Sequence, residues 1–440
     1  METFLIRTLQ LIVSLSILVI VHEFGHFIFA RMFKVRVDKF YLFFNPWFSI
    51  FKFKPKNSDT EYGIGWLPLG GYVKIAGMID ESMDKEQMKQ PVQQWEFRAK
   101  PAWQRLLIMT AGVIFNFILA LFIYSMITFT WGKSYIPMQN VTNGFTFNPV
   151  AIEAGFRNGD IPVSADGTQL KTLDGNCVRA IAEAKTVKVL RNDEPVLINI
   201  PQDFMLRLVG SKEHFASYRV PPVISEVIPG SGAEKAGLKS GDKIYSVNMN
   251  LTEDLPQFFD VLSVCNPGDT LNIAVFTNND IIFVKAALDE NKKLGIMLEP
   301  ITKVYVPVTE KYSLLESIPV GIKQGFDTLG GYISDFKYVF TKEGAESLGG
   351  FGTIGSIFPP VWDWEAFWSM TAFLSIILAF MNILPIPALD GGHVLFLLYE
   401  VVARRKPSEK FLERSQMVGM IFLIMLLIVA NGNDIIRLFK

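Results

Sequence analysis

Four long apolar stretches divide this chain of 440 residues, and they constrain its fold more than any other feature. They cover residues 8–30, 106–131, 366–389 and 415–433. Each is about long enough to cross the roughly 30 Å hydrocarbon core of a bilayer as a helix. Because backbone polar groups inside lipid must be paired within the chain, the stretches predict a polytopic α-helical membrane protein with four transmembrane helices.

The composition agrees with a membrane protein and excludes other classes. Hydrophobic residues make up 50% of the chain and charged residues 19%, against about 25% charged residues in soluble domains. The 42 basic residues are balanced by 43 acidic ones, so the excess positive charge that nucleic-acid binding needs is absent. Two cysteines, Cys177 and Cys265, predict neither a disulfide framework nor a cysteine-rich metal site.

Charge asymmetry predicts which side each loop occupies. Short loops rich in Lys and Arg stay cytoplasmic, so both termini and an insert from about 132 to 365 are expected outside. The first apolar stretch is expected to be retained, because it is long, lacks a small-residue cleavage site and carries ionisable residues. The basic residues that support this topology are Arg31, Lys34, Arg36, Lys39, Lys52, Lys54, Lys56, Arg98, Lys100 and Arg105 after the first stretch, and Arg404, Arg405, Lys406, Lys410 and Arg414 after the third.

The insert contains an internal repeat. Ala151–Asp160, AIEAGFRNGD, matches Ala233–Asp242, AEKAGLKSGD, and both describe a short helix closed by Gly, a turn and then a strand. This pattern resembles the core of a PDZ domain, so we expect two tandem α+β PDZ-like domains between the second and third helices, at 135–220 and 221–301. Pro162 removes a backbone donor where the second copy has a strand, so we assign no peptide-binding edge to the first copy.

The remaining soluble segments are assigned more coarsely. Residues 302–365 are expected to form a connector with an amphipathic helix around 314–340, packed on the membrane surface. Residues 1–131 and 366–440 form the N-terminal and C-terminal membrane parts. The segment 95–103, with Trp95, Arg98 and Trp103, predicts an amphipathic element at the membrane interface.

The chemistry begins with His22-Glu23-Phe24-Gly25-His26 inside the first apolar stretch. On a helix, residues four apart point to one side, so both imidazoles can bind one Zn²⁺ through neutral nitrogens. Glu23 is then placed to take a proton from metal-bound water. Ionisable residues inside a membrane span usually mark function; the alternative is that these side chains pair with neighbouring helices.

A zinc site of this type needs a third protein ligand and an open position. Asp390 is the candidate, within Asn382–His393, NILPIPALDGGH, at the end of the third apolar stretch. Two prolines and two glycines break the helix there, which membrane proteins tolerate only beside protein or a water-filled cavity. His393 is the rival ligand, and nothing in the sequence brings Glu61 to the site.

The HEFGH and NILPIPALDGG motifs together resemble the site-2 protease family of intramembrane zinc metalloproteases. The four-span layout with an external PDZ-like pair is similar to the bacterial regulator of sigma-E protease group within it. The resemblance implies that His22, His26 and Asp390 bind one Zn²⁺ ion and that Glu23 is the general base and acid. It also implies that Asn382 holds substrate backbone or the oxyanion. Asn116 is interpreted as a polar contact between helices.

A glycine-rich segment between the first two spans predicts a substrate-binding element. Gly63–Ile75 has the pattern of a short β-hairpin, within a cytoplasmic hairpin and loop region over 35–104. In the site-2 protease family, which this chain resembles, a corresponding β-loop pairs with unwound substrate. The resemblance therefore implies that Gly70, Gly71 and Tyr72 bind substrate. An ordinary cytoplasmic hairpin is the alternative.

The implied function is cleavage of single-span membrane proteins within the bacterial inner membrane, after a prior external cut, in regulated intramembrane proteolysis. Anti-sigma factors and remnant signal peptides are the expected substrates, with the PDZ-like pair outside and both metal motifs near the cytoplasmic side. Two other classes stay open. A metal transporter has no obvious use for Glu23 or for peptide-binding modules, and an inactive membrane scaffold would not need every metal and base position filled.

Overall fold

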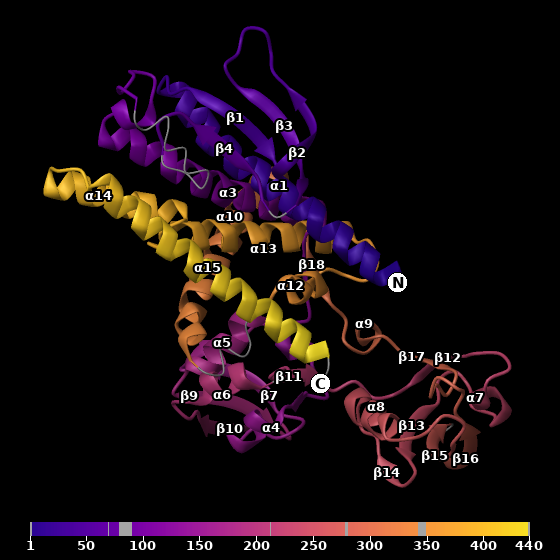
Figure 1. The fold of residues 1–440 in the computed structure, drawn as a ribbon. Helices are drawn as coiled ribbons and strands as arrows, with labels where there is room; N and C mark the ends of the chain where they lie inside the picture. The colour runs from indigo at the N-terminus through magenta and orange to yellow at the C-terminus, as the bar shows by residue number, and fades with distance from the viewer. Residues whose placement is uncertain are drawn as a thin grey trace. The chain divides into compact units, whose positions relative to one another are not determined.

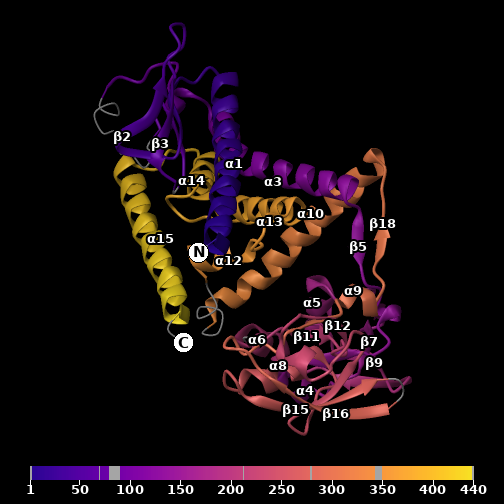
Figure 2. The same cartoon turned by 90° about the vertical axis from the view of Figure 1, so that its right-hand side faces the viewer.

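The structure is a computed structural model that describes residues 2–68, 70–78, 90–211, 213–277, 280–341 and 349–438. The chain forms two compact units (Figures 1 and 2). The first, called the membrane unit here, contains residues 1–133 and 311–440. The second, called the insert, contains residues 134–310.

Among the described residues, four helices of the membrane unit are long and apolar enough to cross a membrane. The four predicted spans are therefore confirmed as helices, each in the expected part of the chain. They are α1 (Glu2–Met32), α3 (Ala102–Thr130), α13 (Trp364–Ile383) and α15 (Glu409–Leu438).

The third span ends earlier than predicted. We expected it to reach residue 389, but α13 ends at Ile383 and a separate helix, α14 (Asp390–Ala403), begins at the candidate ligand. Pro385 and Pro387 account for the early end, because proline lacks a backbone donor and disfavours helical backbone in the residue before it. Asp390 is consequently the first residue of a new helix.

Helix α3 is the centre of the membrane unit, with α1, α13 and α14 packed against it (Figure 2). Gly25 of α1 permits a close approach, because a Cβ atom there would lie 2.6 Å from the carbonyl oxygen of Ala111. Small residues at helix contacts are typical of membrane proteins, where packing rather than the hydrophobic effect drives association. This contact places the histidine face of α1 directly against α3.

A four-stranded sheet follows α1 and has the order β2-β3-β1-β4. Strand β1 pairs in parallel with β3 and antiparallel with β4. The predicted hairpin over Gly63–Ile75 is therefore wrong: both halves are strands, but β1 lies between them. Leu69, within that segment, is outside the described residues. The strands are β1 (Val37–Leu42), β2 (Phe44–Phe53), β3 (Glu61–Leu67) and β4 (Tyr72–Ile75).

Glycines allow β3 to fit so closely between its neighbours. A Cβ atom at Gly63 would lie 2.3 Å from the ring of Tyr41, and one at Gly65 would lie 2.1 Å from the carbonyl oxygen of Phe44. The glycines that suggested hairpin kinks thus serve close packing inside the sheet. Strand β4 remains at the sheet's edge, paired only with β1 among the described strands.

The segment over 95–103 contains one short helix, η1 (Phe97–Ala99), and the first two residues of α3. Arg98 pairs with Glu96 at 2.5 Å, and the ring of Trp103 lies 5.4 Å from that of Phe33 on the chain that leaves α1. Its location at a membrane interface stays a prediction.

The predicted connector helix is present as α10 (Leu314–Phe336), followed by η3 (Lys337–Phe340) and α12 (Phe351–Ile357). Helix α10 packs along α3: a Cβ atom at Gly321 would lie 2.3 Å from the backbone nitrogen of Ser125, and the rings of Phe326 and Phe117 are 5.2 Å apart. Residues 342–348 of the connector are outside the described part. The position of α10 relative to a membrane surface stays a prediction.

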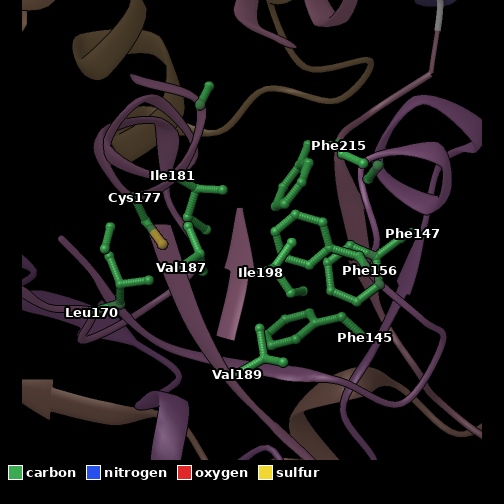
Figure 3. Packing of buried hydrophobic residues seen from close by; sticks show 14 of the residues in the cluster. Phe145, Phe147, Phe156, Leu170, Cys177, Ile181, Val187, Val189, Ile198 and Phe215 are labelled. Carbon is green, nitrogen blue, oxygen red and sulfur yellow. The ribbon is translucent and has the colours of Figure 1, made fainter. Parts of the chain in front are cut away.

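The insert contains two halves with the same order of elements. Each has a short helix, two strands, a longer helix and a closing pair of strands, and each forms a four-stranded sheet with its own core. Figure 3 shows the first core, where the rings of Phe147, Phe156 and Phe215 contact one another at distances of 5.0 to 5.5 Å. The elements of the first half are β6 (Phe145–Phe147), α4 (Pro149–Glu153), β7 (Ile161–Ala165), β8 (Thr168–Gln169), α5 (Gly175–Glu183), β9 (Thr186–Arg191), β10 (Glu194–Asn199), α6 (Phe204–Gly210) and β11 (Ala216–Tyr218).

The second half repeats this order, except that no helix equivalent to α6 stands before its last strand among the described residues. Its elements are β12 (Ile224–Val227), α7 (Gly232–Lys235), β13 (Lys243–Val247), β14 (Asn250–Leu251), α8 (Leu255–Ser263), β15 (Thr270–Thr277), β16 (Asp280–Ala287) and β17 (Ile296–Leu298). A short pair, β5 (Lys133–Tyr135) and β18 (Val308–Glu310), joins the start of the insert to its end, with η2 (Met138–Asn140) and α9 (Ile301–Val304) between.

Pro162 does not prevent a strand. It lies in β7 opposite Val189, and the register shifts between Pro162 and Ser164. The equivalent strand of the second half also shifts, between Ile244 and Ser246. There the N–H of Ile244 donates to the carbonyl of Pro222 at 2.9 Å, a bond that Pro162 cannot make. The second half therefore has a backbone hydrogen bond between its strand β13 and the segment before β12 that the first half cannot form at the equivalent position of β7.

Candidate metal centre

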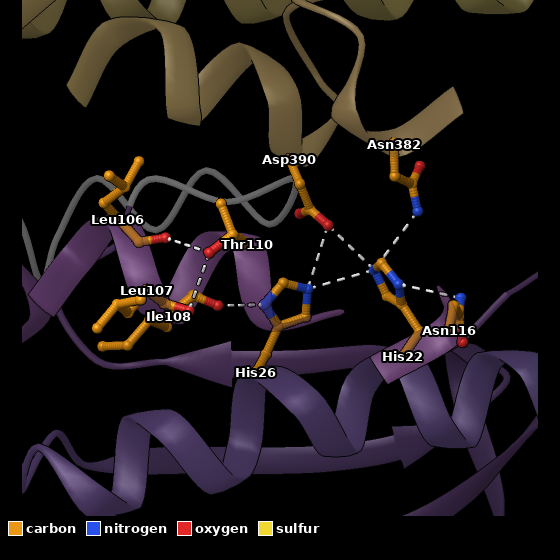
Figure 4. Close-up of polar contacts among 9 residues, drawn as sticks. All are labelled: His22, His26, Leu106, Leu107, Ile108, Thr110, Asn116, Asn382 and Asp390. Atoms are coloured by element: carbon orange, nitrogen blue, oxygen red, sulfur yellow. Dashed lines mark hydrogen bonds and ion pairs between the residues drawn. The ribbon is translucent and has the colours of Figure 1, made fainter. Parts of the chain in front are cut away.

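Two helices from opposite ends of the sequence bring three metal-binding side chains together. Helix α1 carries His22 and His26 one turn apart, and Asp390 starts α14. The Nε2 atoms of His22 and His26 lie 3.1 and 3.2 Å from Oδ2 of Asp390 and 3.2 Å from each other (Figure 4). All three predicted ligands therefore meet at one point, and both histidines are buried.

The spacing of these atoms fits a tetrahedral zinc ion. With Zn–N and Zn–O distances of about 2.0–2.1 Å, the ligand atoms of a tetrahedral site are about 3.3 Å apart. The three measured separations are 3.1, 3.2 and 3.2 Å. Two neutral imidazoles and one carboxylate are also a donor set that catalytic zinc sites use, with a fourth position left for water or substrate.

A backbone carbonyl orients His26. Its Nδ1 lies 2.8 Å from the carbonyl oxygen of Ile108 on α3. A carbonyl can only accept, so Nδ1 carries the hydrogen and the Nε2 lone pair faces the cluster. The Nδ1 of His22 lies 3.4 Å from the side-chain amide of Asn116, also on α3.

Gly112 of α3 makes room for both rings. A Cβ atom at this position would lie 2.5 Å from Nε2 of His26 and 2.8 Å from Nε2 of His22. Any larger residue would push the imidazoles out of their present positions. Sequence reasoning missed Gly112; its only signal was a glycine inside an apolar span, which marks close helix contacts in general.

The glycines after Asp390 pack the start of α14 against the preceding turn. A Cβ atom at Gly391 would lie 2.0 Å from the carbonyl oxygen of Leu384, and one at Gly392 would lie 2.6 Å from that of Ile386. Ala388 adopts a positive φ of 77° in the turn, a conformation that costs energy for a residue with a side chain. This compact turn aims the Asp390 carboxylate at α1.

A cavity of about 510 Å³ opens onto the cluster. Glu23 also lines it, and its carboxylate accepts a hydrogen bond from the backbone of Val73 in β4 and interacts electrostatically with all three converging residues. The predicted substrate-binding residues line the same cavity, and β4 contributes part of its wall. The lining includes Val19, His22, Glu23, His26, Phe44, Gly70, Gly71, Tyr72, Val73, Leu378, Asn382, Asp390, His393, Gln416 and Met420.

Tyr72 is held by its neighbours at the start of β4. Its ring stacks on those of Tyr41 and Phe44 at 5.4 and 6.1 Å, and its hydroxyl donates to Oδ1 of Asn45 at 2.9 Å. At Gly71 a Cβ atom would lie 2.6 Å from the carbonyl oxygen of Tyr41. The edge of the sheet is thereby held against the cavity in a defined position.

Three further polar residues, Asn382, His393 and Glu61, differ in how they lie relative to the cluster. Asn382, near the end of α13, places its amide nitrogen 3.5 Å from Nε2 of His22. His393 lines the cavity, but its Nε2 lies 2.9 Å from the amide nitrogen of Gln416 on α15, and it is not in the metal-binding group. Glu61 accepts from the hydroxyl of Tyr41 at 2.7 Å.

The arrangement has the parts of a hydrolytic metal site. Three ligands converge, a carboxylate lies beside them, an amide faces them, and a cavity gives access for a peptide. The cavity wall includes the edge of a sheet, which can accept an extended strand.

Comparisons with known proteins agree with this geometry. The model of peptidase family M50 matches residues 10–426. The Regulator of sigma E protease of Haemophilus influenzae is 29% identical over 460 residues, covering 97% of this chain and 98% of the relative. Protease RseP of Yersinia pestis is 28% identical, covering 97% and 98%. A Rickettsia conorii protein named as a zinc metalloprotease is 29% identical, covering 98% of each chain.

Proposed function

This chain belongs to peptidase family M50, the site-2 family of membrane zinc metalloproteases, and we propose that it cleaves membrane-embedded substrates at the cluster of His22, His26 and Asp390. One observation carries this proposal: three zinc-type ligand atoms converge beside Glu23 in a cavity walled by a sheet edge. Both sequence motifs contribute ligands, since His22 and His26 lie in α1 and Asp390 starts α14.

In the proposed site His22, His26 and Asp390 would hold one Zn²⁺ ion. When bound, zinc polarises the scissile carbonyl and lowers the pKa of water toward 7. Glu23 accepts a proton from the attacking water and later delivers one to the leaving amine. The amide of Asn382 donates to the substrate carbonyl oxygen as negative charge develops on it.

Substrate is proposed to bind as an extended strand along β4. A helical peptide bond is shielded, so a spanning substrate must unwind before attack, and pairing with a sheet edge holds it extended. The position of Gly70, Gly71 and Tyr72 on the cavity wall supports their assignment to this step.

The two halves of the insert are proposed to be tandem PDZ-like domains, at 135–220 and 221–301, on the external side of the membrane. Their repeated element order and separate cores support this assignment. PDZ folds capture carboxyl termini and extended strands. The pair would then act as a size filter or as a reader of new carboxyl termini, so that substrates trimmed outside reach the zinc site.

The substrates are proposed to be single-span proteins of the anti-sigma factor and remnant signal peptide type in a bacterial inner membrane. The names of the relatives from Haemophilus influenzae and Yersinia pestis support a role in sigma-E regulation. The basic loops after the first and third spans support a cytoplasmic location for the adjacent metal motifs.

A metal transporter or an inactive scaffold fits the observations less well. Transport needs no carboxylate beside the ligands and no sheet edge in the cavity wall. A scaffold needs no converging ligand atoms at all. Family membership and the presence of every metal and base position favour a working protease.

Purified full-length protein in detergent, incubated with a tagged single-span substrate that lacks most of its outer domain, tests the proposal. We expect cleavage inside the span by the wild type, and none by Glu23→Gln or by a chelated sample. Glu23→Gln should still bind zinc. Appreciable turnover by this variant would contradict the role of Glu23, and turnover in the chelated sample would contradict the metal mechanism.

A further inference from the structure

Asn116 is a fully buried residue on α3 whose side-chain oxygen has no hydrogen-bond partner among the described residues. Its amide nitrogen lies 3.4 Å from Nδ1 of His22 (Figure 4). Buried polar atoms in native proteins are almost always paired. The unpaired oxygen beside a histidine of the metal cluster therefore calls for a physical explanation.

The chemistry of imidazole provides one. A neutral histidine that turns the lone pair of Nε2 toward a metal carries its hydrogen on Nδ1, and that hydrogen needs an acceptor. An amide nitrogen cannot accept. Because the nitrogen and oxygen of an Asn side chain are distinguished only by their hydrogen bonds, turning the amide by half a rotation places Oδ1 opposite the Nδ1–H of His22.

The other histidine shows the same arrangement with a different acceptor. His26 presents Nδ1 to the carbonyl of Ile108 at 2.8 Å. Ile108, Gly112 and Asn116 are four residues apart on α3, so they share one face of the helix. This face supplies an acceptor for His26, space for both rings and, at Asn116, a group that can serve His22.

We propose that Asn116 is a positioning residue that accepts the Nδ1–H of His22 and thereby fixes the tautomer and ring orientation of that ligand. The inference rests on the proposed ligation of zinc by Nε2 of His22. It refines the interpretation of Asn116 as a polar contact between helices, because its side chain joins α3 to His22 of α1. The backbone of Asn116 makes a second interhelical contact: Ser375 of α13 donates to its carbonyl oxygen at 2.7 Å.

Ser375 also provides a matched control. Ser375→Ala removes the hydrogen bond between α3 and α13 at Asn116 and leaves the side-chain amide in place. Asn116→Leu keeps a similar volume and the backbone carbonyl but removes the acceptor for His22. Asn116→Asp keeps an acceptor at the same place, as in the carboxylate–histidine–zinc arrangement.

The experiment measures zinc affinity of full-length protein by competition with a chromophoric chelator. We expect Asn116→Leu to weaken binding by about 10- to 100-fold, the usual effect of losing such a partner. Ser375→Ala and Asn116→Asp should stay within about threefold of the wild type on the same scale. Wild-type affinity for Asn116→Leu, or equal losses for Asn116→Leu and Ser375→Ala, would overturn the inference.

A second measurement needs no substitution at Asn116. Nitrogen NMR of ¹⁵N-histidine-labelled, zinc-loaded protein, with His214 and His393 replaced, reports on His22 and His26 alone. Protonated Nδ1 on both rings is expected, and protonated Nε2 on His22 would overturn the proposal. If the protein with an intact Asn116 binds no zinc, the proposed function itself fails; if it binds zinc and Asn116→Leu binds equally well, only the role of Asn116 fails.

Discussion

Gly112 and His26 are so close that a Cβ atom on the glycine would lie 2.5 Å from Nε2 of the imidazole. Helices α1 and α3 meet at this point. The imidazole of His26 on α1 occupies the space that a side chain at position 112 of α3 would fill. The metal cluster therefore depends on a residue that has no chemistry of its own.

Gly112→Ala is the first test of this dependence. The added methyl group must displace the rings of His22 and His26, so zinc affinity should fall by at least about tenfold, comparable to the loss of an orienting partner. The fold should remain, because the displaced atoms are ends of side chains. Chelator competition measures the affinity, with Gly330→Ala as the control, since none of the described atoms lies within 4 Å of a Cβ atom there. Unchanged affinity in Gly112→Ala would show that the rings can move without losing the site.

The third ligand can be identified by comparing two neighbouring residues of α14. Asp390 converges on both histidines, whereas His393 lies beside Gln416. Asp390→Ala should abolish stoichiometric zinc binding and proteolysis, because a buried three-ligand site loses its only carboxylate. His393→Ala should retain one zinc per chain, measured by atomic emission after gel filtration. The reverse result would make His393 the ligand.

Tyr72 separates substrate binding from metal binding. Tyr72→Ala removes the ring that stacks on Tyr41 and Phe44, so the start of β4 loses its support. KM should rise by about tenfold, which corresponds to a loss of about 1.4 kcal/mol in the free energy of substrate binding. Tyr72→Phe keeps the ring that stacks and removes the hydroxyl that donates to Asn45, so its KM should stay closer to that of the wild type. Zinc content should not change in either variant. A Tyr72→Ala enzyme with wild-type kinetics would argue against the role of this edge.

The insert should lose stability in acid partly through Asp166. Backbone N–H groups of Lys185 and Thr186 donate to its carboxylate at 2.8–3.0 Å and hold its pKa below the ordinary value. A carboxyl group whose pKa is lower in the folded protein than in the unfolded protein stabilises the fold at pH values above its pKa in the unfolded protein, near 4. This stabilisation is lost as the pH falls through the pKa of the group in the folded protein. Asp166→Asn should therefore reduce the stability of the sheet at pH 7 more than at pH 3.

Hydrogen exchange of β9 in full-length protein, followed in increasing urea, measures this difference. The matched variant is Asp193→Asn, in the turn between β9 and β10, where no such bonds to the carboxylate occur among the described contacts. Equal effects of Asp166→Asn at both pH values would contradict the linkage argument.

Local sequence patterns predicted much of this protein. Apolar length located the four spans, because a helix that crosses lipid must satisfy a fixed dimension. The spacing of His22 and His26 predicted two imidazoles on one face, because helical periodicity is local. The prolines and glycines around Asp390 predicted a break in the helix at that place. The similar segments Ala151–Asp160 and Ala233–Asp242 predicted the repeated order of elements in the insert.

Tertiary structure decided what lies between these elements. Strand β1 separates β3 from β4, although their sequences read as a hairpin, because pairing with an earlier strand leaves no trace in the local pattern. The positions of Ile108, Gly112 and Asn116 opposite the histidines follow from how closely two helices approach, which depends on side chains of both. The sequence by itself determined which residues could hold a metal. The packing of α1, α3 and α14 decided where the ligand atoms of those residues meet, because the distance between two helices depends on contacts between residues far apart in the sequence.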